Sequence, residues 1–415
     1  MASLGGSVVV NIGNDIIESF LRGKGLTRTG SDIGKEVEFW VDSLLECGML
    51  SIDEFEKFLR QELFYGKRKL IRVYDFTEYN TQGWINRLKT LYGVVDENYS
   101  NILGTGVSSE ELLKIASVQS STNYKGDLQW VDILFVHYAE ELTSRSLVQT
   151  RSYIPVEIDF ITKQVFIKAW NRNGLTEDFR PNVLMDKVYS IIEKVFKFTI
   201  ASRQLQRKST LFSMSQGIVR EIYSKIPAYN QIKDFDDSIS AFEAQIVSNM
   251  NLVNISTENL KSDNSNVFDL HDELQKILEK LVVSDYFYSI PYEQVWDLDI
   301  NAIISRIRFN DVEHVLTSLS GEESEMPIFC TKTFLALKKS MEDAKLVERL
   351  WVVSKRKRRM LKYRYDATNE YYLELMVLNN ARYKKEDLLF IMEMYNKYVS
   401  EQTCRITRLD RQCAC

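Results

Sequence analysis

One basic run near the C-terminal end carries the side chains best suited to chemistry. It comprises Lys355, Arg356, Lys357, Arg358 and Arg359 in direct succession, followed by Lys362, Tyr363 and Arg364. No acid occurs from Arg349 to Arg364, although the whole chain of 415 residues has a formal net charge of −5. Cations at this spacing repel one another unless solvent or an anionic partner offsets the repulsion. The run therefore predicts a site that binds anions.

Aromatic residues interleave with these cations at Trp351, Tyr363 and Tyr365. In nucleic-acid-binding proteins, cations contact the phosphates and aromatic rings stack on the bases. We therefore predict that nucleic acid binds through the basic run and the residues that follow it, Lys355 to Arg359, Lys362, Tyr363 and Arg364. The overall acidity of the chain indicates that such contacts are local. Two alternatives explain the same residues. Cations on an exposed edge strand prevent edge-to-edge pairing, and a basic ribbon can dock an acidic partner protein.

Two smaller basic clusters occur elsewhere in the chain and could extend the same surface. One consists of Lys67, Arg68, Lys69 and Arg72, and the other of Arg203, Arg207 and Lys208. Clusters of this kind are more often solvated faces than binding sites. The sequence leaves open whether the three clusters converge.

Glu157 and Asp159 are the residues that best fit enzyme chemistry. Strand alternation places both carboxylates on one face of an expected strand, with Lys168 on the next strand. A metal-dependent nuclease needs convergent carboxylates to hold the cation that activates water. The local pattern of an acid two residues before a lysine on a strand is absent, however. The competing interpretation is a solvent-exposed sheet face with no site.

Other catalytic and cofactor motifs are missing. The segment from Gly25 to Ser31 has the spacing of a phosphate-binding loop but lacks its lysine, and Ser109 replaces the third glycine of a dinucleotide fingerprint. The three histidines and five cysteines make no metal-ligand spacing. We expect no cofactor, no metal and no catalytic residue. Few cysteines, no apolar stretch of about 18 residues and no secretory leader favour a cytoplasmic protein without a membrane partner.

The elements that must position the basic run belong to an expected multi-domain α+β fold, because a chain this long exceeds one ordinary core. The expected division is a mostly helical domain at 1–125, an antiparallel meander with helices at 126–253, a polar linker at 254–266, a winged-helix-like α+β module at 267–400, and a tail at 401–415.

Hydrophobic periodicity supports the first two domains. Apolar residues at Val37, Trp40, Val41, Leu44 and Leu45 form one helical face. Ser51 to Glu54 resembles a capping box for the next helix, and a further helix is expected at Glu110–Ser117. Strands at Trp130–Tyr138, Leu147–Phe160 and Gln164–Trp170 predict a three-stranded antiparallel meander with one solvent-exposed face.

The last domain is expected to begin with a helix near Leu270–Leu281, followed by an ambiguous stretch at Ile300–Phe309. A short helix at Asp311–Leu319, a longer helix at Thr331–Leu350 and two strands with a turn near Asp366–Asn369 come next, before a helix at Lys385–Val399. This order resembles that of a winged helix, in which the longer helix reads the nucleic acid and the strands form the wing.

The sequence thus favours a non-enzymatic, cytoplasmic nucleic-acid-binding protein that is a component of a larger assembly. A protein–protein adaptor whose basic ribbon docks an acidic partner is the first alternative. A metal-dependent nuclease or another phosphoryl-transfer enzyme is the second.

Overall fold

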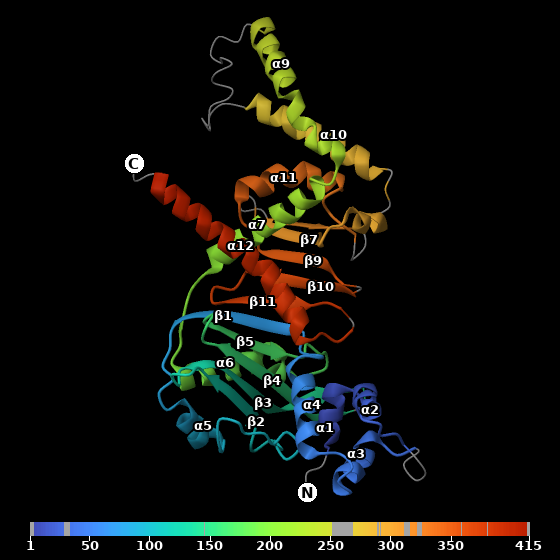
Figure 1. Ribbon diagram of the computed structural model, residues 1–415, viewed down its shortest axis with the longest axis vertical. Coiled ribbons are helices and arrows are strands. Elements are labelled where there is room, and N and C mark those ends of the chain that lie inside the picture. Colours follow the sequence, from blue (N-terminus) through green and yellow to red (C-terminus); the bar gives the residue numbers. More distant parts are fainter. Residues whose placement is uncertain are drawn as a thin grey trace. The chain divides into compact units, whose positions relative to one another are not determined.

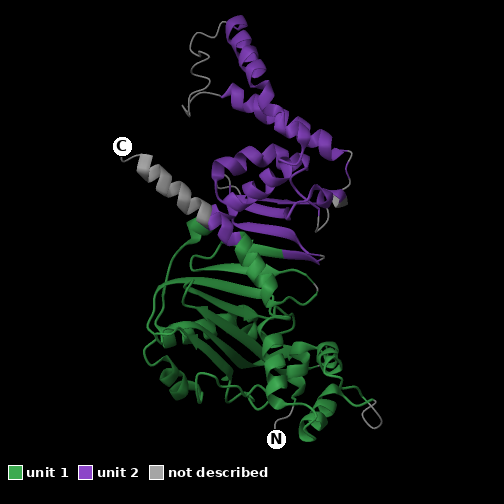
Figure 2. Cartoon of the chain, in the orientation of Figure 1, with its two compact units in different colours: residues 1–207, 363–394 green, residues 208–362, 395–415 purple. Residues whose placement is uncertain are grey.

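The computed structural model describes residues 4–28, 34–144, 146–250, 269–288, 290, 292–310, 316–321, 326–357, 359–379 and 381–412, with the side chains of Tyr292, Glu293 and 400–412 left aside. The chain forms two compact units (Figure 2). Unit 1 contains Met1–Arg207 and Tyr363–Met394, and unit 2 contains Lys208–Lys362 and Tyr395–Cys415. The predicted linker at 254–266 lies outside the described residues, and the predicted domain boundaries remain predictions.

Four helices open unit 1: α1 (Gly6–Ile12), α2 (Asn14–Gly23), α3 (Val37–Glu46) and α4 (Ile52–Phe64) (Figure 1). The predicted apolar face of α3 is buried at Val37, Trp40, Val41 and Leu44. Gly13 separates α1 from α2 with a φ of 116°, a conformation that side chains rarely adopt. Helix α4 begins directly after Ser51 as expected, but the Ser51 side chain makes no capping hydrogen bond.

An antiparallel sheet forms the body of unit 1. Its strands lie in the order β2 (Leu113–Thr122), β3 (Leu128–Leu142), β4 (Leu147–Asp159), β5 (Gln164–Ala169), β1 (Leu70–Glu78) and β11 (Tyr372–Val377), and the short β6 (Thr199–Ile200) also pairs with β1. The α+β character and the predicted meander are confirmed, because β3, β4 and β5 pair in succession. The helix expected at Glu110–Ser117 is wrong. Residues from Leu113 onward form β2 instead, because they pair with the long strand β3.

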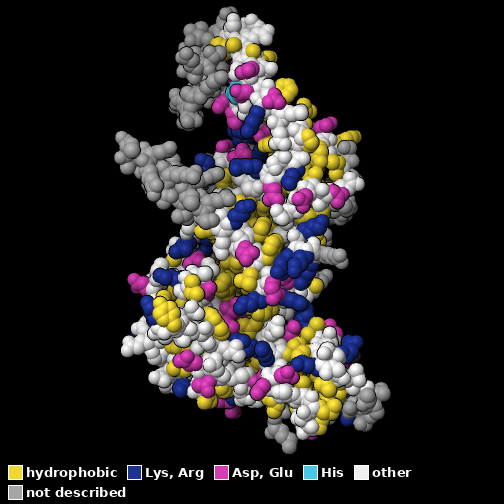
Figure 3. Space-filling view, viewed as in Figure 1, with side chains coloured by type: hydrophobic (Ala, Val, Ile, Leu, Met, Phe, Trp, Pro, Cys, Tyr) yellow, Lys and Arg dark blue, Asp and Glu magenta, His cyan; other side chains and the backbone are white. Residues whose placement is uncertain are grey.

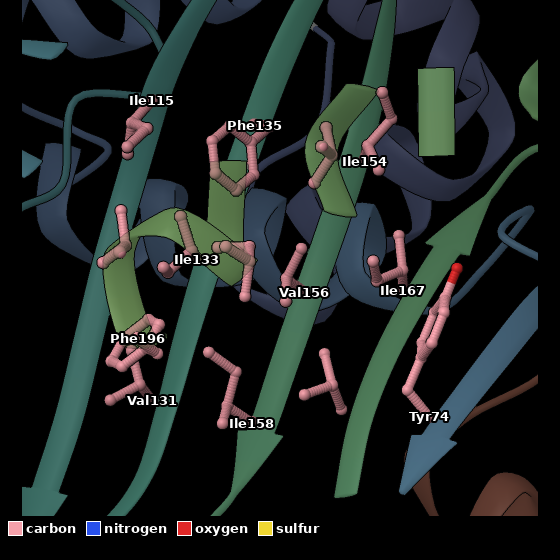
Figure 4. Close-up of a cluster of buried hydrophobic side chains, with 14 of the residues drawn as sticks. Tyr74, Ile115, Val131, Ile133, Phe135, Ile154, Val156, Ile158, Ile167 and Phe196 are labelled. Carbon is pink, nitrogen blue, oxygen red and sulfur yellow. The ribbon is translucent and has the colours of Figure 1, made fainter. Parts of the chain in front are cut away.

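Helices cover both faces of this sheet. On one face, α5 (Trp84–Tyr92) and α6 (Pro181–Phe196) pack on the apolar side chains of the strands. Figure 4 shows Ile133, Phe135 and Val156 from neighbouring strands gathered with Phe196 of α6. On the other face, α1 contacts β4, and α4 contacts both β3 and β4. The expectation of one solvent-exposed face is therefore wrong, because the N-terminal helices occupy it.

Unit 2 begins within α7 (Gln204–Tyr223) and continues with α8 (Pro227–Asn230), η3 (Ile232–Phe235), α9 (Asp236–Asn249), α10 (Leu270–Tyr288) and η5 (Tyr292–Leu298). The ambiguous Ile300–Phe309 stretch forms strand β7 (Ala302–Asn310). Strand β8 (Leu316–Ser320) replaces the described part of the helix expected at Asp311–Leu319, and that expectation is wrong there because these residues pair with β7. Residues 311–315 lie outside the described part.

The helix expected at Thr331–Leu350 is α11 (Lys332–Ala344), which is shorter than expected. The hydroxyl of Thr331 accepts a hydrogen bond from the Phe334 amide at 3.2 Å, which fixes the beginning of the helix. The helix ends at Lys345, whose φ is 54°. The chain then enters β9 (Arg349–Arg356), which pairs with β7.

The basic run forms a hairpin rather than one continuous ribbon. Strand β9 ends at Arg356, and β10 (Arg359–Asp366) begins three residues later. Lys357 has a left-handed φ of 55° and makes the turn, while Arg358 lies outside the described residues. A second turn follows at Asp366, whose carboxylate accepts from the Thr368 amide, as expected. The final helix, α12 (Lys385–Gln412), continues beyond the predicted end at Val399.

Candidate functional site

The hairpin of β9 and β10, together with the neighbouring strand β7, forms the candidate site of unit 2. Lys355 and Lys357 are exposed, whereas Arg356, Arg359 and Lys362 are half-buried. Lys and Arg side chains gather over the right-hand ends of β9 and β10 in the space-filling view (Figure 3). The described cations of the predicted site from 355 to 362 therefore share one hairpin and lie at or near its surface.

Arg306 of β7 adds a cation that the sequence analysis did not identify. Its guanidinium lies over the indole of Trp351, 4.7 Å from the ring centroid, and donates to the hydroxyl of Ser318 at 3.4 Å. Arg306 and Trp351 are register partners across β7 and β9. Arg306 is exposed and Trp351 is half-buried. The contact joins residues far apart in the sequence, so only the strand register reveals it.

Three of these cations stand apart from the acidic side chains that the structure describes. Within the described part of the chain, no carboxylate forms an ion pair with Arg306, Lys355 or Lys357. The nearby Arg308 differs, because its Nε lies 3.4 Å from the carboxylate of Glu348. Exposed cations without acids leave their charge available to an external anion.

Tyr363 and Arg364, the last two predicted site residues, belong to unit 1 and have inward contacts. Tyr363 is fully buried, 5.4 Å from the ring of Tyr365 in an edge-to-face arrangement. The Tyr365 hydroxyl donates to the carbonyl of Ile391 at 2.6 Å. Arg364 pairs with Glu374 at 2.6 Å. A base could reach Tyr363 only if β10 left the sheet.

The smaller basic cluster at residues 67–72 does not form a solvated face. Arg68 is fully buried and donates to the backbone oxygen and side-chain oxygen of Asn11 at 3.0 and 2.7 Å. Burial and the nearby Arg382 lower the pKa of Arg68 to about 9. Arg72 pairs with Asp186 beneath the ring of Tyr372. These cations hold elements of unit 1 together.

The second small cluster is also engaged. Arg207 donates to Asp75 at 2.8 Å within unit 1. Lys208 donates to Glu348 at 3.0 Å within unit 2. Both carboxylates have low exposure, 17% and 11%. Arg207 and Lys208 therefore link elements within their own units, and their charges are neutralised by these carboxylates.

Glu157 and Lys168 meet in the interior of unit 1, whereas Asp159 does not join them. Lys168 and the hydroxyl of Tyr65 both donate to Oε1 of Glu157 at 2.5 Å. Asp159 instead accepts from the amides of Ile161 and Thr162 in the turn after β4. The predicted pairing of Glu157 with Asp159 at one site is thus absent from the observed contacts.

Asp132 is the second carboxylate beside Glu157, and sequence reasoning missed it. The two residues are register partners on β3 and β4, and Arg60 of α4 donates to Asp132 at 2.8 Å. Desolvation and the Glu157 charge raise the pKa of Asp132 to about 6. Burial opposes ionisation of Glu157, but the Lys168 ammonium and the two hydrogen bonds keep the pKa of Glu157 below its ordinary value.

This buried cluster has the chemistry of a structural clamp. Two carboxylates, Asp132 and Glu157, face the cations Arg60 and Lys168, and Lys385 adds a further positive charge nearby. Lys168 also lies 4.0 Å from the centroid of the Tyr65 ring, and burial lowers its pKa. Among the described residues, no group of three or more His, Cys, Asp or Glu side chains could hold a metal ion. The cluster joins α4 to the sheet.

A hollow of about 100 Å³ in unit 2 is bordered by α10 and α11. Its wall carries lysines and glutamates that pair with each other, including Lys338 with Glu279 at 2.7 Å and Lys339 with Glu273. Burial raises the pKa of Glu342 in the same wall. Because the charges largely neutralise one another, the hollow favours neither an anion nor a cation.

No protein-family model matches the chain, and no curated protein resembles it in sequence. Within the described residues, every helix is too short or too polar to cross a membrane. The site must therefore be interpreted from its own geometry and charge.

Proposed function

We propose that this protein binds nucleic acid through the β9–β10 hairpin and acts without enzymatic chemistry. The observation that carries the proposal is a set of exposed cations, Arg306, Lys355 and Lys357, that form no ion pair within the described residues of a protein whose formal net charge is −5. Phosphates are the anions that such a hairpin would contact, and each neutralised phosphate releases condensed counterions. The overall acidity limits binding to this local surface.

The same proposal assigns a winged-helix-like role to the module that contains the hairpin. In it, β9 and β10 act as the wing, and α11 acts as the helix that approaches the bases. Lys338 and Lys339 of α11 already pair with Glu279 and Glu273. Charge on the wing therefore supplies most of the electrostatic attraction, and α11 contributes shape.

In this proposal the protein acts in the cytoplasm as a component of a larger assembly, and it needs no cofactor. An acidic partner protein is the alternative occupant of the same cations, because exposed lysines attract carboxylates as well as phosphates. The two occupants differ in their salt dependence. The affinity for nucleic acid decreases steeply as salt concentration rises, and log affinity is linear in log salt concentration, because binding releases condensed counterions.

The test compares two charge-matched double variants. Lys355→Gln with Lys357→Asn removes two hairpin charges, and asparagine tolerates the left-handed φ at position 357. Lys89→Gln with Lys194→Gln removes the same charge from exposed helix positions in unit 1. Binding of 20-nucleotide DNA and RNA, single-stranded and duplex, is measured by fluorescence anisotropy at several salt concentrations.

The hairpin variant is expected to weaken binding of every nucleic acid and to flatten the log–log salt slope by about one unit for each lost contact. The unit 1 variant is expected to bind like the wild type. Absence of salt-dependent binding by the wild type, or equal loss in both variants, would overturn the proposal. Binding of an acidic protein in its place would establish the adaptor function.

A further inference from the structure

We propose that the hairpin selects unpaired nucleic acid, with a base stacking on the outer face of the Arg306 guanidinium. This inference rests on the proposed nucleic-acid binding and adds the class of substrate. The ligand it names is single-stranded DNA or RNA with bases free to leave a stack. The contact between the Arg306 guanidinium and the Trp351 indole supports this inference.

A register shift in β7 creates this juxtaposition. Ile304 pairs with Val352, and the next pair joins Arg306 to Trp351, so that Ser305 is the extra residue of a bulge. A bulge changes the direction of the side chains that follow it. Without it, Ser305 would lie opposite Trp351. The bulge therefore places a planar cation on the indole.

The Trp351 ring and Ser318 hold the Arg306 guanidinium in position before any ligand arrives. The guanidinium lies 4.7 Å from the ring centroid, and its second contact is the hydroxyl of Ser318 at 3.4 Å. A guanidinium stacked on an aromatic ring loses less rotational freedom when it next binds a planar group. Arg306 is exposed, so part of its side chain is accessible to a ligand from solvent.

Unpaired bases fit this arrangement better than a duplex does. Proteins that recognise single strands stack splayed bases on aromatic rings or on guanidinium planes. In a duplex, both faces of each base are already stacked. Lys355 lies about 13 Å further along β9, but Val353 lies between Trp351 and Lys355 on the same strand face and is only 1% exposed. The proposed stacking site therefore consists of Arg306 and Trp351.

Arg306→Lys tests the inference because it keeps the charge and removes the plane. Arg308→Lys is the matched control, since Arg308 lies two residues away on β7 but pairs with Glu348. Both variants are measured against 20-nucleotide single strands and the corresponding duplexes, as DNA and as RNA, over a range of salt concentrations.

Arg306→Lys is expected to lose roughly tenfold in single-strand affinity, in line with the contribution of one stacked base. Its salt slope and its duplex affinity are expected to stay unchanged, and Arg308→Lys is expected to match the wild type. Trp351→Leu, which removes the ring beneath the guanidinium, is expected to reproduce the single-strand loss.

The outcomes separate this inference from the function on which it rests. Equal single-strand affinities of Arg306→Lys and the wild type, with salt-dependent binding intact, would overturn the stacking role and leave phosphate binding in place. Equal losses on single strands and duplexes would do the same. If the wild type binds no nucleic acid, the proposed function itself is wrong.

Discussion

The cations of unit 1 and those of the hairpin in unit 2 show how the same types of side chain acquire opposite physical roles. Arg68, Arg72 and Lys168 are at most 3% exposed, and each contacts polar or aromatic groups of unit 1. Lys355 and Lys357 are exposed and have no acidic partner in the described chain. A cation run alone therefore does not identify a binding surface. The surroundings of each residue decide whether its charge is used internally or remains available.

The difference follows from what covers each strand. Strands β1 and β5 lie inside a sheet with helices on both faces, so alternate side chains point into packed layers whether they are apolar or charged. Charges buried there need specific partners, because desolvation without compensation is costly. The hairpin ends in a turn at Lys357, where water can solvate each ammonium.

The largest expected effect tests the internal role of a unit 1 cation. Replacing Lys168 with Met leaves the carboxylate of Glu157, which is 17% exposed, beside Asp132 without its ammonium. Loss of one partner from a buried pair lowers the free energy of unfolding by about 3–5 kcal/mol. Urea unfolding followed by circular dichroism measures the change.

The matched control adds Glu157→Gln to Lys168→Met. Glutamine carries no charge and still accepts from the Tyr65 hydroxyl, so part of the lost stability should return. If Lys168→Met alone changed stability by less than about 1 kcal/mol, a magnitude ordinary for surface substitutions, the contrast between buried and exposed cations would fail.

A smaller effect is expected from pH, and it too belongs to unit 1. The folded protein raises the pKa of Asp132 to about 6, so between its ordinary pKa and this value the folded state binds more protons than the unfolded state. Stability should therefore decrease as pH rises through this window. In the Asp132→Asn variant the amide oxygen can still accept from Arg60. The variant should therefore lack the decrease in stability that titration of Asp132 causes. Urea unfolding at intervals from pH 4.5 to 6.5 provides the comparison. A slope that persists unchanged in Asp132→Asn would assign the titration to another group.

Particular residues show how far the sequence could predict this structure. An apolar run of strand length identified β3, and alternation identified β4 and β5 on either side of the turn at Thr162 and Lys163. The turn at Lys357 was missed, since no Gly, Asn or Pro marks it and a lysine adopts the left-handed conformation. Asp132 and Arg306 were missed because their partners, Glu157 and Trp351, become neighbours only through strand register. Tyr363 was predicted to be accessible because cations flank it, but it shares a strand face with Leu361 and Tyr365 and is buried.

The smallest expected effect is on the stability of the hairpin variant, and it completes the contrast. Lys355→Gln with Lys357→Asn removes two exposed ammonium groups that make no ion pair within the described chain. Substitutions at such positions change the free energy of unfolding by no more than about 0.5 kcal/mol. Relief of repulsion among the adjacent cations acts in the stabilising direction. Urea unfolding should therefore give a midpoint equal to or slightly above that of the wild type, while nucleic-acid affinity decreases. A clear loss of stability would instead indicate that these lysines are needed for the folded hairpin, and the contrast with the buried cations of unit 1 would fail.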